Sequence, residues 1–341
     1  MSLNTQLNDL QTNIETLKGK LSSNITSKGV NDVSSSMTLT ELADAVNRIN
    51  TSGGGDAIVL DENLRFAYSK SKSIILSRYD FTAIKDASNL FYNCGNLDTI
   101  YGTLDCTNIT DMNNMFNSCT MLELYNYNNT LTNTHNVTNM KNMFSYCSSL
   151  QSVPTLDCSS CTNMDSMFFS CSNMVDVGNS LVNTHNVTNM NNMFNQCTIL
   201  TITPFIDYSS CKTMSSMYGY CSNLQSTVGD INSFNATSMT SMFYGCKSLT
   251  TIGVIECSAA TNVDNMFKGC DNLTMIGGLN DLKVSLDLSQ CPNLEYNSLI
   301  NILNSLGDGS LNQATLTLGS NVDKLTDDDK SIAINKGWTI A

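Results

Sequence analysis

The stretch TNTHNVTNMKNMF at 132–144 decides the fold, because VNTHNVTNMNNMF at 182–194 repeats it with two changes. The closing Met-Phe pair recurs, with small variations, in steps of 24 to 28 residues. Its copies are Leu90-Phe91, Met115-Phe116, Met143-Phe144, Met167-Phe168, Met193-Phe194, Met217-Tyr218, Met242-Phe243 and Met266-Phe267. Eight copies in phase indicate a repeat architecture.

Each repeat places its apolar residues at helical spacing. Met112, Met115, Phe116, Cys119 and Leu122 stand at i, i+3, i+4, i+7 and i+10, which predicts a short helix with one apolar face. The residues that follow, such as LTITPFID at 200–207, are typical of a strand. One repeat cannot bury its apolar face alone, so we expect the repeats to stack. The sequence therefore predicts an α/β solenoid, a leucine-rich-repeat array of about eight coils of 24–28 residues over 81–292.

Units such as NVTNMNNMFNQCTIL at 186–200 resemble the BspA-like leucine-rich repeats of bacterial surface proteins. The resemblance covers roughly residues 81–292. It implies adhesion and partner binding at a surface, and it does not single out one ligand.

The N-terminal flank carries apolar residues in alternating steps of four and three. These are Leu3, Leu7, Leu10, Ile14, Leu17 and Leu21. The pattern predicts a coiled-coil oligomerisation stem over 1–26, with a helix packed on its own chain as the alternative. Leu at most seam positions leaves dimer and trimer open, and the analogy with fibres favours a homotrimer.

A short helix and a Gly linker are expected over 27–55, followed by an N-terminal cap of the solenoid over 56–80. This order of segments resembles the N-terminal attachment segments of phage tail fibre and baseplate proteins.

A C-terminal α/β cap is expected over 293–341, because the open end of a solenoid must be covered. The pattern predicts a helix over 297–306, a strand over 314–319 and a further helix that begins at Asp327, Asp328 and Asp329. Acidic residues in a first turn suit the helix dipole, so we interpret them as capping residues. The ending LTLG…KGWTIA also resembles the tail segment that follows such repeats in phage and gut-bacterial proteins.

Most of the fourteen Cys stand three residues after the repeated ring. We expect reduced, buried packing residues, with a disulfide or metal ladder as the alternative. Cys158 and Cys161 form a CxxC motif, but no second pair stands at zinc spacing. His135 and His185 occupy equivalent positions two coils apart, roughly 10 Å at strand spacing, which is too far to share a metal. We therefore expect no metal and no cofactor.

A row of carboxylates recurs in alternate coils: Asp105, Asp157, Asp207, Glu256 and Asp287. Such a row can bind calcium, and two of its members can form a glycosidase pair. A position that is repeated five times indicates a structural role, so we expect the carboxylates to cap turns or strand ends. Catalytic residues are not expected.

Two positions within M-F-x-x-C turn away from the apolar face on the helical interpretation. They hold Tyr92, Tyr146, Phe169, Tyr220 and Tyr244, which we interpret as partner-binding residues that stack on a sugar or anchor a protein. Scattered surface aromatics or contacts between neighbouring coils are the alternative.

The net charge of −13 argues against nucleic acid as a partner. The chain has no stretch of 18 apolar residues, so we expect no membrane insertion.

These features favour a non-enzymatic virion tail protein that recognises a host surface glycan or protein and contacts other tail proteins. Free Cys and a start without a signal peptide favour folding in the cytoplasm and export by virion assembly. A bacterial cell-surface adhesin or secreted interaction protein is the alternative. A solenoid enzyme that degrades polysaccharides is the second alternative.

Overall fold

The structure is a computed structural model of the 341-residue chain. It describes residues 58–59, 66–76, 79–124, 130–175, 177–178 and 180–341. The chain divides into two compact units, 1–58 and 59–341, and the account below concerns the second. The predicted stem over 1–26 lies outside the described residues, as do the helix and linker over 27–55. The predicted division into domains stays a prediction.

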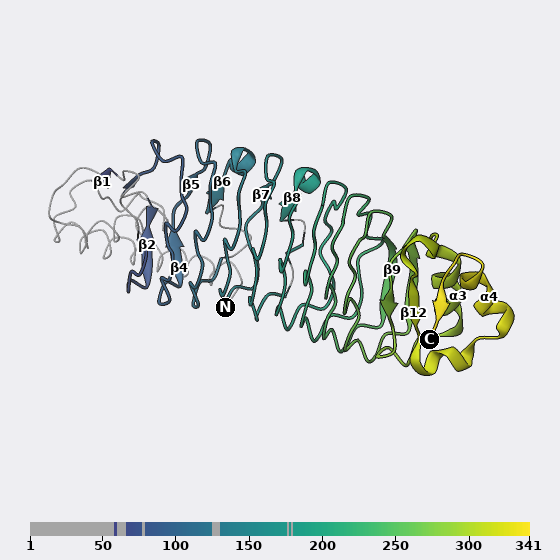
Figure 1. The fold of residues 1–341 in the computed structure, drawn as a ribbon. Coiled ribbons are helices and arrows are strands. Elements are labelled where there is room, and N and C mark those ends of the chain that lie inside the picture. Colours follow the sequence, from purple (N-terminus) through teal and green to yellow (C-terminus); the bar gives the residue numbers. More distant parts are fainter. Residues whose placement is uncertain (1–57, 60–65, 77–78, 125–129, 176, 179) are drawn as a thin grey trace, which may run out of the picture. The chain divides into compact units, whose positions relative to one another are not determined.

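Consecutive repeats of the second unit lie side by side as parallel coils (Figure 1). Single backbone bridges, all parallel, run through Asp86, Asp111, Asn139, Asn163, Asn189, Thr213, Ser238 and Asn262. Each of these residues precedes the apolar segment of its coil, and each is joined to its counterpart in the next coil. The prediction that the repeats stack is confirmed over these residues. We call this the coil stack.

Short strands follow the turns, and every register between them is parallel because a strand pairs with its counterpart in a neighbouring coil. Pairs form between β2 (Ser73–Ile75) and β4 (Thr99–Tyr101), β5 (Leu104–Asp105) and β6 (Leu131–Thr132), β7 (Leu156–Asp157) and β8 (Leu181–Val182), and β9 (Thr251–Glu256) and β10 (Met275–Asn280). The remaining short elements of this region are β1 (Ile58–Val59), β3 (Tyr79–Asp80) and the 3-10 turns η2 (Thr134–Asn136) and η3 (Thr184–Asn186).

The predicted short helix in each coil is wrong. In the segment from Met112 to Cys119 the chain forms a series of tight turns, and Asn114 and Ser118 have φ of 56° and 63°. The N–H groups of Met115 and Cys119 donate to the carbonyl three residues earlier. Those of Asn114 and Ser118 donate instead to the next coil. Stacking thus takes every second N–H group, and a helix would need all of them.

The core of the coil stack is a ladder of nine parallel rings. Neighbouring ring centroids lie 5.0 to 5.9 Å apart, and the ring planes differ by 2 to 15°. We number the coils 1 to 9 by these rings, in order Phe66, Phe91, Phe116, Phe144, Phe168, Phe194, Tyr218, Phe243 and Phe267. Phe66 extends the ladder by one coil beyond the eight copies of the sequence motif. Eight of the nine rings are fully buried, so the ladder forms the continuous core that one coil cannot provide.

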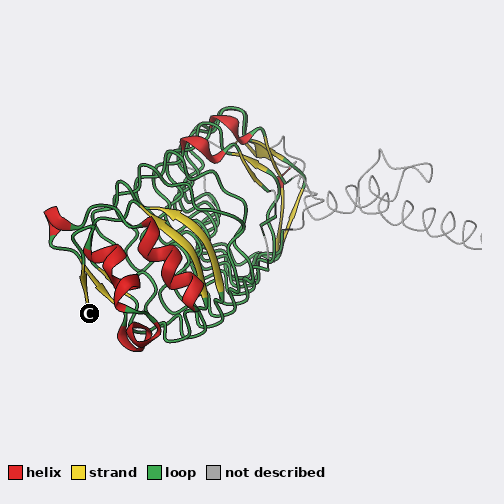
Figure 2. Ribbon diagram, turned by 90° about the vertical axis from the view of Figure 1, so that its right-hand side faces the viewer, coloured by secondary structure: helices red, strands yellow, loops and turns green. Residues whose placement is uncertain are grey.

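Helices and a small sheet follow the coil stack at its C-terminal end (Figures 1 and 2). The helix predicted over 297–306 is confirmed as α3 (Tyr296–Ser305), which packs on β10. The sheet has the order β11 (Leu286–Asp287), β12 (Thr315–Thr317) and β13 (Thr339–Ile340). The 3-10 turns η4 (Ser310–Asn312) and η5 (Gly319–Lys324) lie before and after β12.

The second predicted helix is confirmed as α4 (Asp327–Ile334), and its first residues act as expected. The side chain of Thr326 accepts a hydrogen bond from the N–H of Asp329, whose carboxylate accepts one from the N–H of Thr326. This reciprocal pair is a capping box. Among the described residues, no helix is both long and apolar enough to cross a membrane.

Candidate binding surface

The repeated Cys are packing residues with one additional bond. All fourteen are buried and free, as expected. The thiol of Cys147 donates to the carbonyl oxygen of Phe116 at 3.0 Å, and that of Cys171 to Phe144 at 3.0 Å. Nine thiols, which we call the ladder thiols, donate in this way to the carbonyl oxygen of the ring residue in the preceding coil. They are Cys94, Cys119, Cys147, Cys171, Cys197, Cys221, Cys246, Cys270 and Cys291. Burial raises the pKa of the Cys147 thiol, so this thiol is a poor nucleophile.

The carboxylate row caps turns, as the repetition predicted. The N–H two residues further on donates to each carboxylate, for example Ser159 to Asp157 at 3.0 Å and Ser209 to Asp207 at 2.9 Å. The same contact occurs at Asp105, Glu256 and Asp287. Asn133 and Asn183 in the next coils add a second bond to Asp105 and Asp157. These carboxylates therefore have a structural use in every coil that carries one.

The two histidines lie in equivalent exposed turns, His135 in η2 and His185 in η3. No group of three or more His, Cys, Asp and Glu side chains within the described ranges is arranged to hold a metal ion. The absence of a cofactor stays a prediction.

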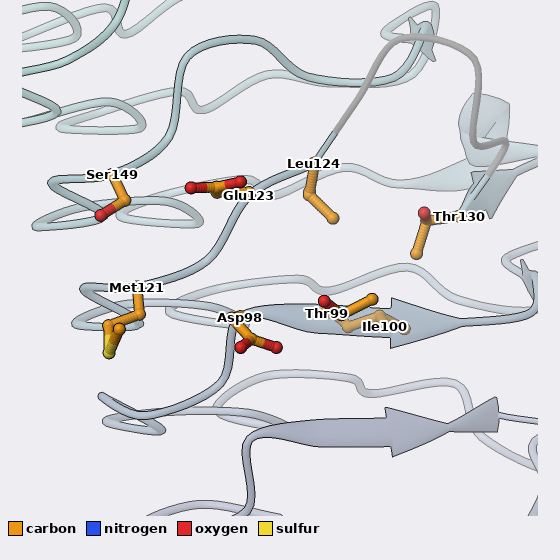
Figure 3. Close-up of a pocket in the computed structure, with 8 residues that line it drawn as sticks. All are labelled: Asp98, Thr99, Ile100, Met121, Glu123, Leu124, Thr130 and Ser149. Carbon is orange, nitrogen blue, oxygen red and sulfur yellow. The ribbon is translucent and has the colours of Figure 1, made fainter. Parts of the chain in front are cut away.

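A hollow of about 340 Å³ lies beside β4 (Figure 3). It is lined by Asp98, Thr99, Ile100, Met121, Glu123, Leu124, Thr130 and Ser149. The side chains of Asp98 and Glu123 come from neighbouring coils, whose backbones are joined by the N–H of Glu123 and the carbonyl of Asp98 at 3.1 Å. The hollow offers two carboxylates, and no basic side chain is among its lining residues.

The five predicted aromatic residues lie on one set of turns, and the structure brings them together in pairs. Tyr146 packs against Phe169 with ring centroids 5.2 Å apart and planes at 70°. Tyr220 packs against Tyr244 at 5.1 Å and 59°. In each pair the first ring is about half exposed, 49% for Tyr146 and 51% for Tyr220, and the second ring is partly buried beneath it.

The fifth predicted residue, Tyr92, pairs with a residue that the sequence argument missed. Tyr68 lies 5.6 Å from Tyr92, with ring planes at 76°, and it is 66% exposed. Its signal was present in the sequence, because Phe66 and Tyr68 have the same separation as Phe144 and Tyr146. We call the three pairs, 68/92, 146/169 and 220/244, the ring-pair edge. The first ring of each pair is exposed, as we predicted for the second and third pairs, and it also contacts a ring of the neighbouring coil, as the alternative interpretation has it.

The first ring of each pair stands on an unusual backbone. Tyr68, Tyr146 and Tyr220 have φ of 64°, 61° and 58°, a left-handed conformation that bulky residues rarely adopt. The same position in other coils is occupied by small or polar residues: Asn93, Ser118, Ser170, Gln196, Gly245 and Gly269. Every coil has this left-handed conformation at this position, so the backbone belongs to the repeat, and a bulky ring there is what distinguishes coils 1, 4 and 7.

The hydroxyl group of Tyr220 stays neutral in this setting. Partial desolvation and then the neighbouring Tyr244 raise its pKa. Tyr220 therefore presents an uncharged ring with a hydroxyl group.

A family model described as "Mycoplasma protein of unknown function, DUF285" matches residues 62–180 and 175–276. No curated protein matches the chain. A crystal structure of a leucine rich cell surface protein from Faecalibacterium prausnitzii A2-165 is similar over 78% of this chain and 82% of that one, with 16% identity and a TM-score of 0.25.

Proposed function

The chain belongs to the family described as "Mycoplasma protein of unknown function, DUF285", and from its exposed ring pairs we propose that it is a non-enzymatic binding protein of the bacterial cell surface. It acts as an adhesin or as a secreted interaction protein. The coil stack is the scaffold, and the ring-pair edge is the contact surface.

The exposure of Tyr146 and Tyr220 carries this proposal. The core already has its own ring ladder, so these side chains are not needed to fill it. Aromatic side chains supply much of the binding energy of protein surfaces, and a left-handed backbone under a bulky ring has a conformational cost of roughly 1–3 kcal/mol. A role in binding accounts for both observations.

The carboxylate row supports a function without catalysis. Asp157 and Asp207, for example, are engaged by the backbone of their own turns. A glycosidase pair needs carboxylates that face a substrate, and repeated capping provides the opposite arrangement.

The cell surface replaces the virion tail that the sequence ranked first. The tail interpretation drew on residues 1–55, which lie outside the described residues, on the ending LTLG…KGWTIA and on the free Cys. The family match does not support a phage setting. The family description points to a bacterium, as does the resemblance to BspA-like repeats. Assembly into a homotrimer through Leu3, Leu7, Leu10, Ile14, Leu17 and Leu21 remains part of the proposal, and contacts with other tail proteins are not retained.

Attachment of protein-coated beads to a panel of bacterial and animal cells tests the function. We expect the Tyr146→Ser, Tyr220→Ser, Tyr244→Ser triple variant to bind at least about tenfold fewer cells, since anchor residues cost 2 kcal/mol or more when truncated. Its melting temperature should stay nearly unchanged, because the replaced rings lie outside the buried ladder.

A matched control removes exposed aromatics that do not belong to the ring-pair edge. Phe205 and Phe234 are 71% and 57% exposed, so Phe205→Ser with Phe234→Ser should leave attachment intact. Normal attachment by a well-folded triple variant, or equal losses in both variants, would count against this edge as the contact surface.

A further inference from the structure

The ring pairs recur at a constant interval along the coil stack. They join coils 1 and 2, coils 4 and 5, and coils 7 and 8. The two positions are the same in every pair. In the earlier coil the ring stands two residues after the ladder ring, as Tyr146 does after Phe144, and in the later coil it stands one residue after, as Phe169 does after Phe168. Ladder rings lie 5.0 to 5.9 Å apart, so three coils span roughly 15–17 Å, somewhat more than three ideal strand spacings.

Polar side chains fill the intervals between the ring pairs. Coil 3 carries Asn117 and Ser118 at the two positions, both partly exposed, and coil 6 carries the exposed Gln196 beside the buried Asn195. Next to the central pair, Ser170 is partly exposed, whereas Ser145 is buried. The edge thus alternates between aromatic surface and amide or hydroxyl groups, and it does not form one continuous apolar patch.

The surroundings of the edge are acidic on balance. Between residues 66 and 271, the range that contains all three ring pairs, the chain has seven Lys, one Arg and fourteen Asp and Glu. The side chain of Lys141 is paired with Asp165 at 2.9 Å. A polyanion would be repelled by this balance of charges. The rings and the amide and hydroxyl groups of the edge are themselves uncharged, which favours a neutral ligand over a cationic one.

We propose that the ring-pair edge binds an extended, neutral polysaccharide laid along the axis of the coil stack. The inference rests on the proposed binding function and names its ligand class. Each ring pair stacks on the apolar face of a sugar, and the polar intervals bind the hydroxyl groups of the sugars between. A β-1,4-linked sugar is about as long as one coil is thick, so one interval corresponds to roughly three sugars.

The partly buried ring in each pair positions the exposed one. Phe169 meets Tyr146 edge to face, which fixes the orientation of the exposed ring before any ligand arrives. Preorganised rings lose little conformational entropy on binding. The pairs also act together, since a ligand held at one pair has a high local concentration at the next.

A folded protein partner fits the edge less well. Protein interfaces concentrate their anchors near the centre of one patch and surround them with a polar rim. On this edge the three ring pairs stand at equal intervals with polar groups between them. This spacing suits a ligand built of repeated units, such as a polysaccharide.

Titration calorimetry with a length series of β-1,4-linked N-acetylglucosamine oligomers tests the proposal. A chain must cover roughly four sugars to place one sugar on each of two adjacent pairs, because the interval between pairs is about three coils. We expect weak binding of the disaccharide and the trisaccharide, and an affinity at least about tenfold higher from the tetrasaccharide onward. An acidic oligomer of the same length, such as oligogalacturonate, should bind less tightly.

Two variants that each remove one pair provide the positional test. The central variant is Tyr146→Asn with Phe169→Asn, and the terminal variant is Tyr220→Asn with Tyr244→Asn. Asn already stands at these positions in other coils, as Asn93, Asn117 and Asn195, so both variants should fold. The terminal variant keeps two adjacent pairs and should lose only part of its tight pentasaccharide binding. The central variant leaves pairs six coils apart and should lose it.

The outcomes separate this inference from the proposed function. Affinity that does not depend on oligomer length, or equal losses in the two variants, overturns the polysaccharide assignment. Absence of binding to any oligomer, combined with loss of cell attachment in the Ser triple variant, also overturns it but leaves a binding function with a protein partner. Undiminished attachment by the triple variant contradicts the proposed function itself.

Discussion

Tyr208 and Tyr218 form the one buried pair in the described coils that departs together from the repeat. Three other coils have Cys at the position of Tyr208, namely Cys106, Cys158 and Cys257, and all other rings of the ladder are Phe. Their hydroxyl oxygens lie 3.0 Å apart, and both side chains are buried. Burial raises the pKa of Tyr208 to about 12 and also raises that of Tyr218. The two neutral hydroxyl groups satisfy each other inside an apolar ladder.

A double-mutant cycle tests this mutual dependence. Tyr208→Phe or Tyr218→Phe alone should lower the free energy of unfolding by about 1–3 kcal/mol, because the remaining hydroxyl group is left buried without its partner. The double variant should recover most of the loss. Urea unfolding followed by circular dichroism gives the three values, and additive losses would contradict the coupling.

At the scale of the element, each coil is a run of turns held by neighbouring coils. The carboxylate of Asp157 illustrates the arrangement, since it accepts from the N–H of Ser159 and from Nδ2 of Asn183 in the next coil. The hydrogen bond from Asn183 is the main cause that lowers the pKa of Asp157, and the bonds from Ser159 add to it. The ionised form is therefore preferred in the folded state.

Acid should weaken these turns. The pKa of Asp157 is lower in the folded state than the unfolded value of about 3.9. The ionised carboxylate therefore contributes its full stabilisation of the fold at a pH well above that value. This stabilisation is lost as the pH falls through the lowered folded pKa. The urea midpoint should therefore decrease between about pH 5 and pH 3. Asp157→Asn should flatten that decrease, because Asn still accepts from Ser159 and does not titrate. An unchanged acid profile in this variant would argue against a stabilising role for the ionised side chain.

At the scale of the coil stack, the thiols and rings form one continuous interior. The thiol of each ladder Cys donates a hydrogen bond to a carbonyl oxygen of the preceding coil. The Cys row therefore links neighbouring coils and also fills the core. Burial raises the pKa of Cys161 and Cys211 to about 11 in both cases. These groups are protonated at neutral pH and closed to solvent.

A thiol titration tests that interior. Native protein at about pH 8 should react slowly with an aromatic disulfide reagent, because a buried thiol must first be exposed by local opening. In denaturant without reductant, all fourteen thiols should react. Several disulfides in freshly purified protein would contradict the expectation of reduced packing residues.

The sequence by itself determined the period, the buried positions and the capping role of the repeated carboxylates. Each follows from a local rule, because every coil repeats the same apolar and turn residues and so meets the same surroundings. The exposed positions of Tyr146 and Tyr220 also followed, although the helix from which they were inferred does not exist.

Only the tertiary structure decided between helix and turn, and which rings meet. The apolar spacing from Met112 to Leu122 suits both conformations, and stacking selects turns because Asn114, Phe116 and Ser118 give their N–H groups to the next coil. Pairing of Tyr146 with Phe169 depends on the register between two coils, which no single repeat contains. Contacts between coils are non-local, so they arise only once the repeats have stacked.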